Sequence, residues 1–210
     1  MPRIEGIIVL LIQFLAVIPS IWLAFVAIWG LSRRKKLYKP AEGQDRFAII
    51  VCARNEEAVI DKLLTSLLQQ KYPKDKIQIF VLADHCTDRT ARVAATFENV
   101  VVMERSDGPT RGKGDVLAWG IRRILREYGE TIDAFAFFDA DNIVRDDYLI
   151  HINDMLQAGE EIVQGNRLGG GPYKTFVTKW FAIYWMVYSF LFSYPRQKMG
   201  LSAFLTGTGF

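Results

Sequence analysis

The sequence has few cysteines and little net charge. Only two of its 210 residues are cysteine, and the spacing of Cys52 and Cys86 fits no metal-site pattern, so we expect two unpaired thiols in a reducing compartment. The formal net charge of +3 is too small to indicate a nucleic-acid partner. Internal repeats and low-complexity tracts do not occur. The length allows one domain of ordinary size with an appendage.

Two common nucleotide-binding motifs are also missing. A Rossmann site needs Gly-x-Gly-x-x-Gly after the first strand, but Arg54-Asn-Glu-Glu57 occupies that place. A P-loop needs a hydroxyl residue directly after its lysine. The segment Gly108-Pro-Thr-Arg-Gly-Lys-Gly114 has the wrong spacing and no hydroxyl after Lys113. Both kinds of nucleotide site are therefore excluded.

A long apolar run stands near the amino terminus. Gly6 to Leu31 contains 26 residues without a charge. As a helix it would be ~39 Å long, enough to cross a ~30 Å hydrocarbon core. It is too long for a signal-peptide core, and no small-residue cleavage site follows. We therefore predict a transmembrane helix over residues 1–32; the alternative is a buried core helix followed by a solvated loop.

The charges that flank this run predict its orientation. Residues 33–46 form a basic linker with Arg33, Arg34, Lys35, Lys36 and Lys39, whereas only Arg3, close to Glu5, precedes the run. The positive-inside rule then places the amino terminus outside and the rest of the chain in the cytoplasm. We expect a protein of the cell membrane with a single span in this chain.

Beyond the linker, short apolar runs alternate with segments of helical periodicity. This alternation predicts an α/β domain with a mostly parallel sheet and flanking helices. The expected strands are 47–53, 77–83, 100–103, 134–138 and 161–164, and the expected helices are 60–68, about 87–97, about 117–128 and 147–156.

Acidic residues follow three of these strands. Asp139 and Asp141 come directly after an apolar strand, and two bare carboxylates so close would repel each other. A hard divalent cation relieves that repulsion, and oxygen ligands suit Mg²⁺ or Mn²⁺. The bland alternative is a turn with two solvated aspartates. The segments 53–57 and 83–88 end their strands at the same expected edge, which favours a site.

A second apolar segment, Trp180 to Tyr194, has 15 residues and many aromatic side chains. It is short for a membrane span. Tryptophan and tyrosine prefer the membrane–water interface, which favours an interfacial helix. A buried core helix is an equally open alternative.

Six segments in order resemble the family 2 glycosyltransferases with the GT-A fold, in particular membrane-anchored processive polysaccharide synthases. They lie within residues 47–210, which the resemblance makes one GT-A domain, incomplete at its carboxyl end. Asp115 and Trp119 depart from the commonest letters of the third segment. The segments are Cys52-Ala-Arg-Asn-Glu-Glu57, Ala83-Asp-His-Cys-Thr-Asp-Arg-Thr90, Gly112-Lys-Gly-Asp-Val-Leu-Ala-Trp-Gly120, Phe137-Phe-Asp-Ala-Asp141, Gln164-Gly-Asn-Arg167 and Gly207-Thr-Gly209.

The resemblance implies a role for each of these segments. Asp84 would accept a hydrogen bond from N3–H of uracil, and Lys113 would approach a phosphate. Asp139 would reach the ribose and the metal, and Asp141 would bind Mn²⁺ or Mg²⁺ directly. The remaining implied residues are Ala53, Arg54, Asn55 and Glu56 for the nucleoside and Gln164, Arg167, Gly207, Thr208 and Gly209 on the acceptor side.

The family further implies an inverting, metal-dependent transfer of sugar from a nucleotide donor, with UDP expected, to a polysaccharide or glycolipid at the cytoplasmic face of the membrane. The general base is expected beyond Phe210, so we expect an amino-terminal fragment of a larger enzyme that is inactive alone. One alternative is transfer to a polyprenyl phosphate, although such enzymes often lack an amino-terminal membrane helix. The other is a non-catalytic nucleotide-binding module, which would be expected to lose the acids. The sugar and the acceptor stay open.

Overall fold

The structure is a computed structural model that describes residues 2–32, 38–109, 111–169, 175–202 and 204–210. It divides into a helical unit, residues 1–37 and 166–204, and a sheet unit, residues 38–165 and 205–210. Each unit is considered by itself. The basic residues Arg33 to Lys36, on which the predicted orientation depends, lie outside the described residues.

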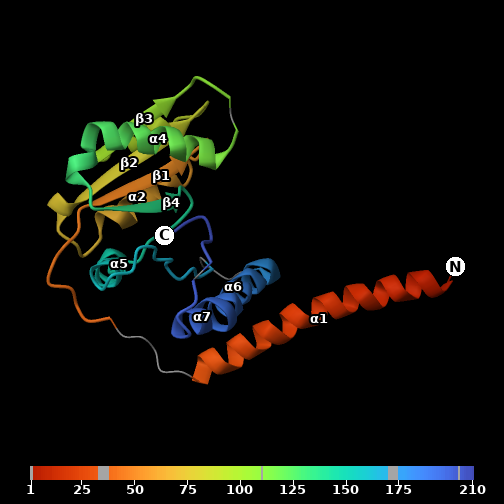
Figure 1. Ribbon diagram of the computed structural model, residues 1–210. Coiled ribbons are helices and arrows are strands. Elements are labelled where there is room, and N and C mark those ends of the chain that lie inside the picture. The colour runs from red at the N-terminus through yellow and green to blue at the C-terminus, as the bar shows by residue number, and fades with distance from the viewer. Residues whose placement is uncertain (1, 33–37, 110, 170–174, 203) are drawn as a thin grey trace. The chain divides into compact units, whose positions relative to one another are not determined.

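The sheet unit contains four parallel strands in the order β3-β2-β1-β4 (Figure 1). Phe47 at the start of β1 pairs with Ile77 of β2 and with Ala134 of β4, so the first residues of these three strands are in register. β1 is central and almost entirely buried, which explains its continuous apolar sequence. The strands are β1 (Phe47–Ala53), β2 (Ile77–Asp84), β3 (Val100–Arg105) and β4 (Ala134–Asp139).

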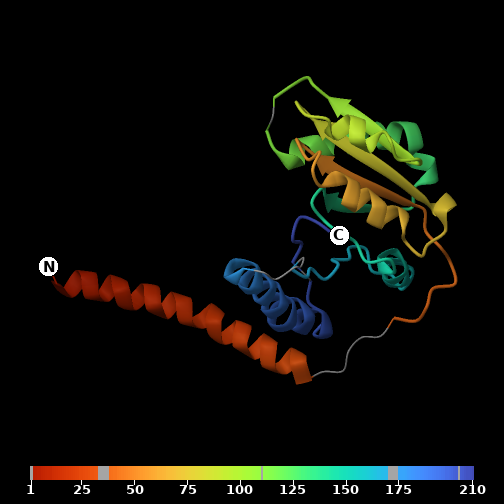
Figure 2. The same ribbon diagram turned by 180° about the vertical axis from the view of Figure 1, so that it is seen from behind.

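Helices cover both faces of this sheet. Phe47, Ile49 and Val51 face a core shared with α2, α3 and α5, whereas Ala48 and Ile50 face a second core beneath α4. Figure 2 shows the sheet from the α2 side. The parallel sheet with flanking helices is confirmed. The helices are α2 (Ile60–Leu68), α3 (Thr90–Ala94), α4 (Lys113–Tyr128) and α5 (Tyr148–Gln157), with short 3-10 turns η1 (Lys74–Lys76) and η2 (Gly129–Thr131).

Three of the predicted elements need correction. The helix expected over about 87–97 has only the five residues of α3, and 3-10-type turns follow it. β3 continues two residues beyond the predicted end at Met103. The strand expected over 161–164 is wrong. Ile162 is largely exposed there, and the Gln164 side chain hydrogen-bonds to backbone groups of 205–210. Gly209 and Phe210, instead, bond to the backbone of Phe137 in β4.

The helical unit contains α1 (Pro2–Ser32), α6 (Phe176–Tyr188), the π-helical turn η3 (Ser189–Ser193) and α7 (Tyr194–Lys198). Gly6–Ser32 is long and apolar enough to cross a membrane. Within this unit α7 contacts α1 closely, since a Cβ on Gly30 would lie 2.3 Å from Pro195. No residue of α6 is buried within the helical unit, so the interpretation of Trp180 to Tyr194 as a buried core helix gains no support from this unit. The interfacial helix stays a prediction.

Candidate functional site

The carboxyl ends of β1, β2 and β4 meet at one edge of the sheet. Ala53 pairs with Ala83 next to the end of β2, and Cys52 pairs with Asp139 at the end of β4. Because the strands are parallel, the polar residues that follow them emerge at the same edge. The strand-end residues that were predicted to form a site therefore lie on adjacent strands.

The loop after β1 is tied to the loop after β2. Asn55 has a left-handed backbone (φ 58°), and its Oδ1 atom accepts a hydrogen bond from the Thr87 amide at 2.8 Å. The Glu56 amide donates to Oγ1 of Thr90 at 2.8 Å. These bonds give Asn55 a structural task beside its predicted role toward the nucleoside. Arg54 and Asn55 are exposed at this edge, whereas Ala53 is buried.

Asp84 is buried at the end of β2 and has one carboxylate oxygen engaged. Its Oδ1 atom lies 2.8 Å from Nδ1 of His85 and 3.5 Å from Nη1 of Arg105. A carboxylate only accepts, so Nδ1 of His85 carries the proton of this hydrogen bond. Among the described residues, Oδ2 accepts no hydrogen bond. That oxygen is available to an N–H group of a ligand.

The sequence did not reveal Arg105 as a member of this site. Its buried guanidinium donates from Nη2 to Asp115 at 2.6 Å and to the Pro109 carbonyl at 3.2 Å. The hydrogen bond with Asp115 is the main reason that the pKa of Arg105 is raised. Arg105 thereby links Asp84 to the first turn of α4. The available signal is the alternation of β3, which continues to Arg105, two residues beyond the predicted end at Met103.

Lys113 is the first residue of α4 and reaches the end of β4. Its Nζ atom donates to Oδ1 of Asp139 and to the carbonyl of Gly207, both at 2.5 Å. The side chains of Lys113 and Asp139 are 34% and 41% exposed, so this ion pair is open to solvent and to a ligand. The structure thus brings Gly207, predicted on the acceptor side, against residues predicted to bind the donor.

Hydrogen bonds also fix the loop that carries Asp141. The Asp139 amide donates to Oγ1 of the buried Thr208 at 2.9 Å, and this hydroxyl donates to Oδ1 of Asn142 at 2.5 Å. The side-chain Nδ2 atom of Asn142 then donates to Oδ1 of Asp141 at 2.9 Å. The Asp141 side chain itself is exposed. Thr208, another residue predicted on the acceptor side, therefore holds the aspartate pair in place.

Negative charge gathers at this edge and shifts nearby pKa values. The pKa of Glu56 is raised, first by burial and then by the charges of Asp141, Asp88 and Asp139. Burial also raises the pKa of the Cys52 thiol to about 11, against a smaller opposing effect of Lys113. Cys52 therefore stays a neutral thiol beneath the site. Both cysteines are unpaired, as predicted.

The donor set at this edge fits a hard divalent cation bound together with a ligand. Asp139 at the end of β4 and the exposed Asp141 in the turn that follows offer carboxylate oxygens, which suits Mg²⁺ or Mn²⁺. In the described part of the chain, no three His, Cys, Asp or Glu side chains are grouped to hold a metal ion by themselves. Such a site needs further oxygen ligands, for example the phosphates of a nucleotide.

The remaining predicted residues have other surroundings. Nε2 of Gln164 donates to the carbonyls of Gly165, Thr208 and Gly209 at 2.8–3.0 Å, and its Oε1 accepts from the Thr206 amide at 2.8 Å. Gln164 thus holds the backbone of 205–210. Arg167 belongs to the helical unit, where its guanidinium lies 4.2 Å from the ring centroid of Trp185.

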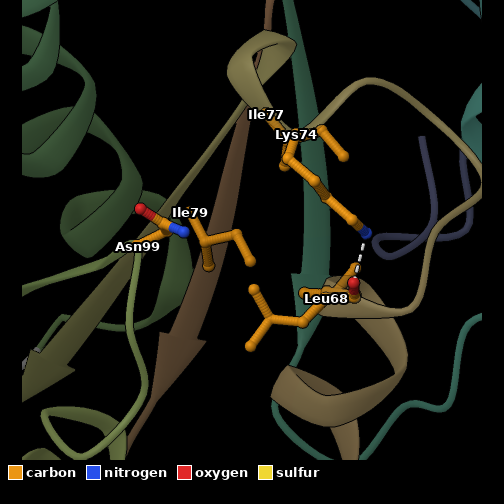
Figure 3. Close-up of a pocket in the computed structure, with 6 residues that line it drawn as sticks. Leu68, Lys74, Ile77, Ile79 and Asn99 are labelled. Carbon is orange, nitrogen blue, oxygen red and sulfur yellow. Dashed lines mark hydrogen bonds between the residues drawn. The ribbon is translucent and has the colours of Figure 1, made fainter.

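The sheet unit has a small cavity at the opposite edge of the sheet from the site and an open groove beside the site. A cavity of about 10 Å³ lies at the amino end of β2, between Leu68, Ile77 and Ile79, where Lys74 donates to the Leu68 carbonyl (Figure 3). It has room for about one water molecule. An open groove of about 570 Å³ runs beside α4 and shares Arg105 and Asp115 with the site; its other lining residues include Trp119, Arg122, Arg123 and Arg126.

The parallel sheet with helices on both faces defines an α/β protein, and comparison with known proteins gives the family. Residues 44–210 match the family described as glycosyltransferase like family 2. The chain belongs to the family 2 glycosyltransferases. A mannosyltransferase from Pyrobaculum calidifontis, solved with GDP-mannose and Mn²⁺, superposes with a TM-score of 0.54 over 76% of this chain and 45% of that chain, at 22% identity. This likeness identifies the fold as GT-A.

Two curated relatives are similar in sequence. The β-monoglucosyldiacylglycerol synthase of Nostoc sp. is 34% identical over 132 residues, which are 60% of this chain and 27% of the relative. The 4,4'-diaponeurosporenoate glycosyltransferase of Staphylococcus aureus is 38% identical over 95 residues, 44% of this chain and 23% of the relative. The matched residues thus span about a quarter of the length of each relative.

Proposed function

We propose that this chain binds a UDP-sugar at the carboxyl edge of the sheet and serves an inverting, metal-dependent transfer of the sugar to a glycolipid or polysaccharide. The observation that carries the proposal is the convergence of Asp84, Lys113 and the Asp139–Asp141 pair at that edge. A relative named for the synthesis of a glucosyl-diacylglycerol supports a lipid acceptor.

Each residue contributes a different part of donor binding. The free Oδ2 atom of Asp84 accepts the N3–H group of uracil and disfavours cytosine, whose N3 is itself an acceptor. Asp139 and Asp141 supply oxygen ligands to Mg²⁺ or Mn²⁺. The bound cation would neutralise the diphosphate as it leaves. Lys113 adds a positive charge at the start of α4, where the helix dipole also favours a phosphate.

In this proposal α1 anchors the protein in the cell membrane and the sheet unit is cytoplasmic. The length and composition of Gly6–Ser32 and the basic sequence that follows support this orientation. The exposed aromatic side chains of α6, including Trp180 and Tyr184, suit the membrane interface. A membrane helix disfavours the polyprenyl-phosphate alternative, and the retained acids disfavour a non-catalytic module.

Calorimetry on the purified chain tests the proposal. UDP should bind more tightly with Mn²⁺ than without it, and Asp141→Asn should lose this metal-dependent part of the affinity. Asp75→Asn is the matched control, because Asp75 is exposed beside the amino end of β2, at the opposite edge of the sheet. Equal UDP affinity with and without metal in the wild type would contradict the assignment.

A further inference from the structure

Lys113 occupies a place that a metal ion would need. Its ammonium group lies 2.5 Å from Oδ1 of Asp139, one of the two carboxylates assigned to the cation. It is the only Lys or Arg side chain within 4 Å of Asp139 among the described residues. An ammonium group and a divalent cation on the same oxygen would repel each other strongly. A cation that binds Asp139 at this position therefore has to displace Lys113.

The surroundings of Lys113 allow such a displacement. Gly112 and Gly114 flank it, and a Cβ at either glycine would meet no atom within 4 Å, so the backbone here is loosely surrounded. Lys113 is one-third exposed. Its second acceptor, the carbonyl of Gly207, belongs to an exposed residue, so water can replace the ammonium group there.

From this geometry we infer that Lys113 is an exchangeable counter-ion that sets the order of binding, an inference that rests on the proposed metal and diphosphate site. In the empty site Lys113 neutralises Asp139 and opposes binding of the metal alone. A diphosphate that arrives with the metal offers Lys113 a new partner. The ammonium group of Lys113 then moves from Asp139 to a phosphate oxygen, and the cation binds Asp139 in its place. The metal and the nucleotide therefore bind together.

The exchange predicts that loss of the lysine charge changes two binding affinities in opposite directions: that for Mn²⁺ alone and that for the nucleotide in the presence of Mn²⁺. In Lys113→Gln the competitor is removed, so Mn²⁺ alone should bind about 3- to 10-fold more tightly, the order expected for a partly exposed charge pair. The same variant lacks a charge for the diphosphate, so the nucleotide in saturating Mn²⁺ should bind about 3- to 10-fold more weakly. Lys113→Arg keeps the charge and should behave like the wild type in both titrations.

The experiment measures free Mn²⁺ by electron paramagnetic resonance on the full chain in detergent, without nucleotide. It then measures affinity for UDP or GDP, whichever the wild type binds more tightly, in saturating Mn²⁺. Lys62→Gln is the matched control, since Lys62 is exposed on α2 on the opposite face of the sheet from α4. Urea unfolding confirms that each variant is folded.

The outcomes separate this inference from the proposed function. Unchanged or weaker binding of Mn²⁺ alone by Lys113→Gln, in a chain that still binds metal with nucleotide, would overturn the exchange and leave the metal site standing. A purely structural role of Lys113 would weaken both titrations together and would also overturn it. Failure of the wild type to bind Mn²⁺ with either nucleotide would overturn the proposed site and the exchange with it.

Discussion

Replacement of Asp84 by asparagine should invert the preference of the site for pyrimidine bases. In Asp84→Asn the His85 Nδ1 atom still lies 2.8 Å from the position of Oδ1, and Nη1 of Arg105 lies 3.5 Å from it without a hydrogen-bond partner of its own. The amide oxygen should take that position, because Arg105 can only donate. The amide NH₂ group then replaces Oδ2 and faces the base. This NH₂ group cannot accept a hydrogen bond from the N3–H donor of uracil, whereas it can donate one to N3 of cytosine.

The size of the effect follows from the bond that is lost. Hydrogen bonds to charged groups contribute about 1.5–3 kcal/mol, so UDP affinity should fall about 10- to 100-fold. CDP should lose far less or gain. The fold should survive, because Arg105 keeps its ion pair with Asp115 at 2.6 Å and no buried charge is left alone.

Calorimetric titrations with UDP and CDP in saturating Mn²⁺ measure the two affinities, and urea unfolding checks the fold. Asp115→Asn is the control, because it removes the other carboxylate partner of Arg105 and leaves Asp84 intact. It should shift stability with little change in the UDP-to-CDP ratio. An unchanged ratio in Asp84→Asn would show that Asp84 does not read the base.

Three further predictions concern folding and reactivity. Gly120→Ala should destabilise the chain by about 1–3 kcal/mol in urea unfolding, because its Cβ would lie 2.3 Å from a leucine of β2. Gly114→Ala is the control, because its Cβ meets open space and should leave the stability unchanged. Equal stabilities of the two variants would contradict the packing beneath α4. The Arg46 guanidinium holds the pKa of Asp133 well below its usual range, so this ion pair should stabilise the fold above the unfolded-state pKa of about 4 and lose its effect as the pH falls below that value. The difference in unfolding free energy between wild type and Asp133→Asn should therefore shrink when the pH is lowered from about 6 to about 2. A difference that stays constant over this range would refute the prediction. With its pKa raised to about 11, Cys52 should stay unmodified by a maleimide at pH 8 until the chain unfolds, as mass spectrometry of the peptides would show.

The sequence predicted the elements whose pattern is local. The buried run of β1 and the apolar periodicity of α2 set their bounds without further information, and β4 ends at Asp139, one residue beyond the expected end. Contacts between distant residues were not readable. The strand expected over 161–164 failed because Gln164 bonds to a segment more than forty residues away, a partner that no local pattern indicates.

The same distinction applies to the site. The strand-end acids were found because parallel strands bring their carboxyl ends together, a property of the topology. The partners of those acids were not found. Arg105 of β3 pairs with Asp84 of the neighbouring β2, and Thr208 reaches Asp139 over 69 positions of sequence. Such pairings depend on the completed fold, so the sequence predicted which residues form the site better than how they are held.

The path of the chain at Gly165 has an architectural consequence. The backbone leaves the sheet unit after Gly165 and re-enters it at Leu205, and the two ends of this excursion are joined where Gly165 N donates to Gly209 O at 2.7 Å. Residues 166–204 are thus a modular insertion with its base closed. An insertion with joined ends can change in length or sequence while the sheet keeps its connectivity. A change within residues 166–204 therefore leaves the order of the strands that carry Asp84 and Asp139 as it is.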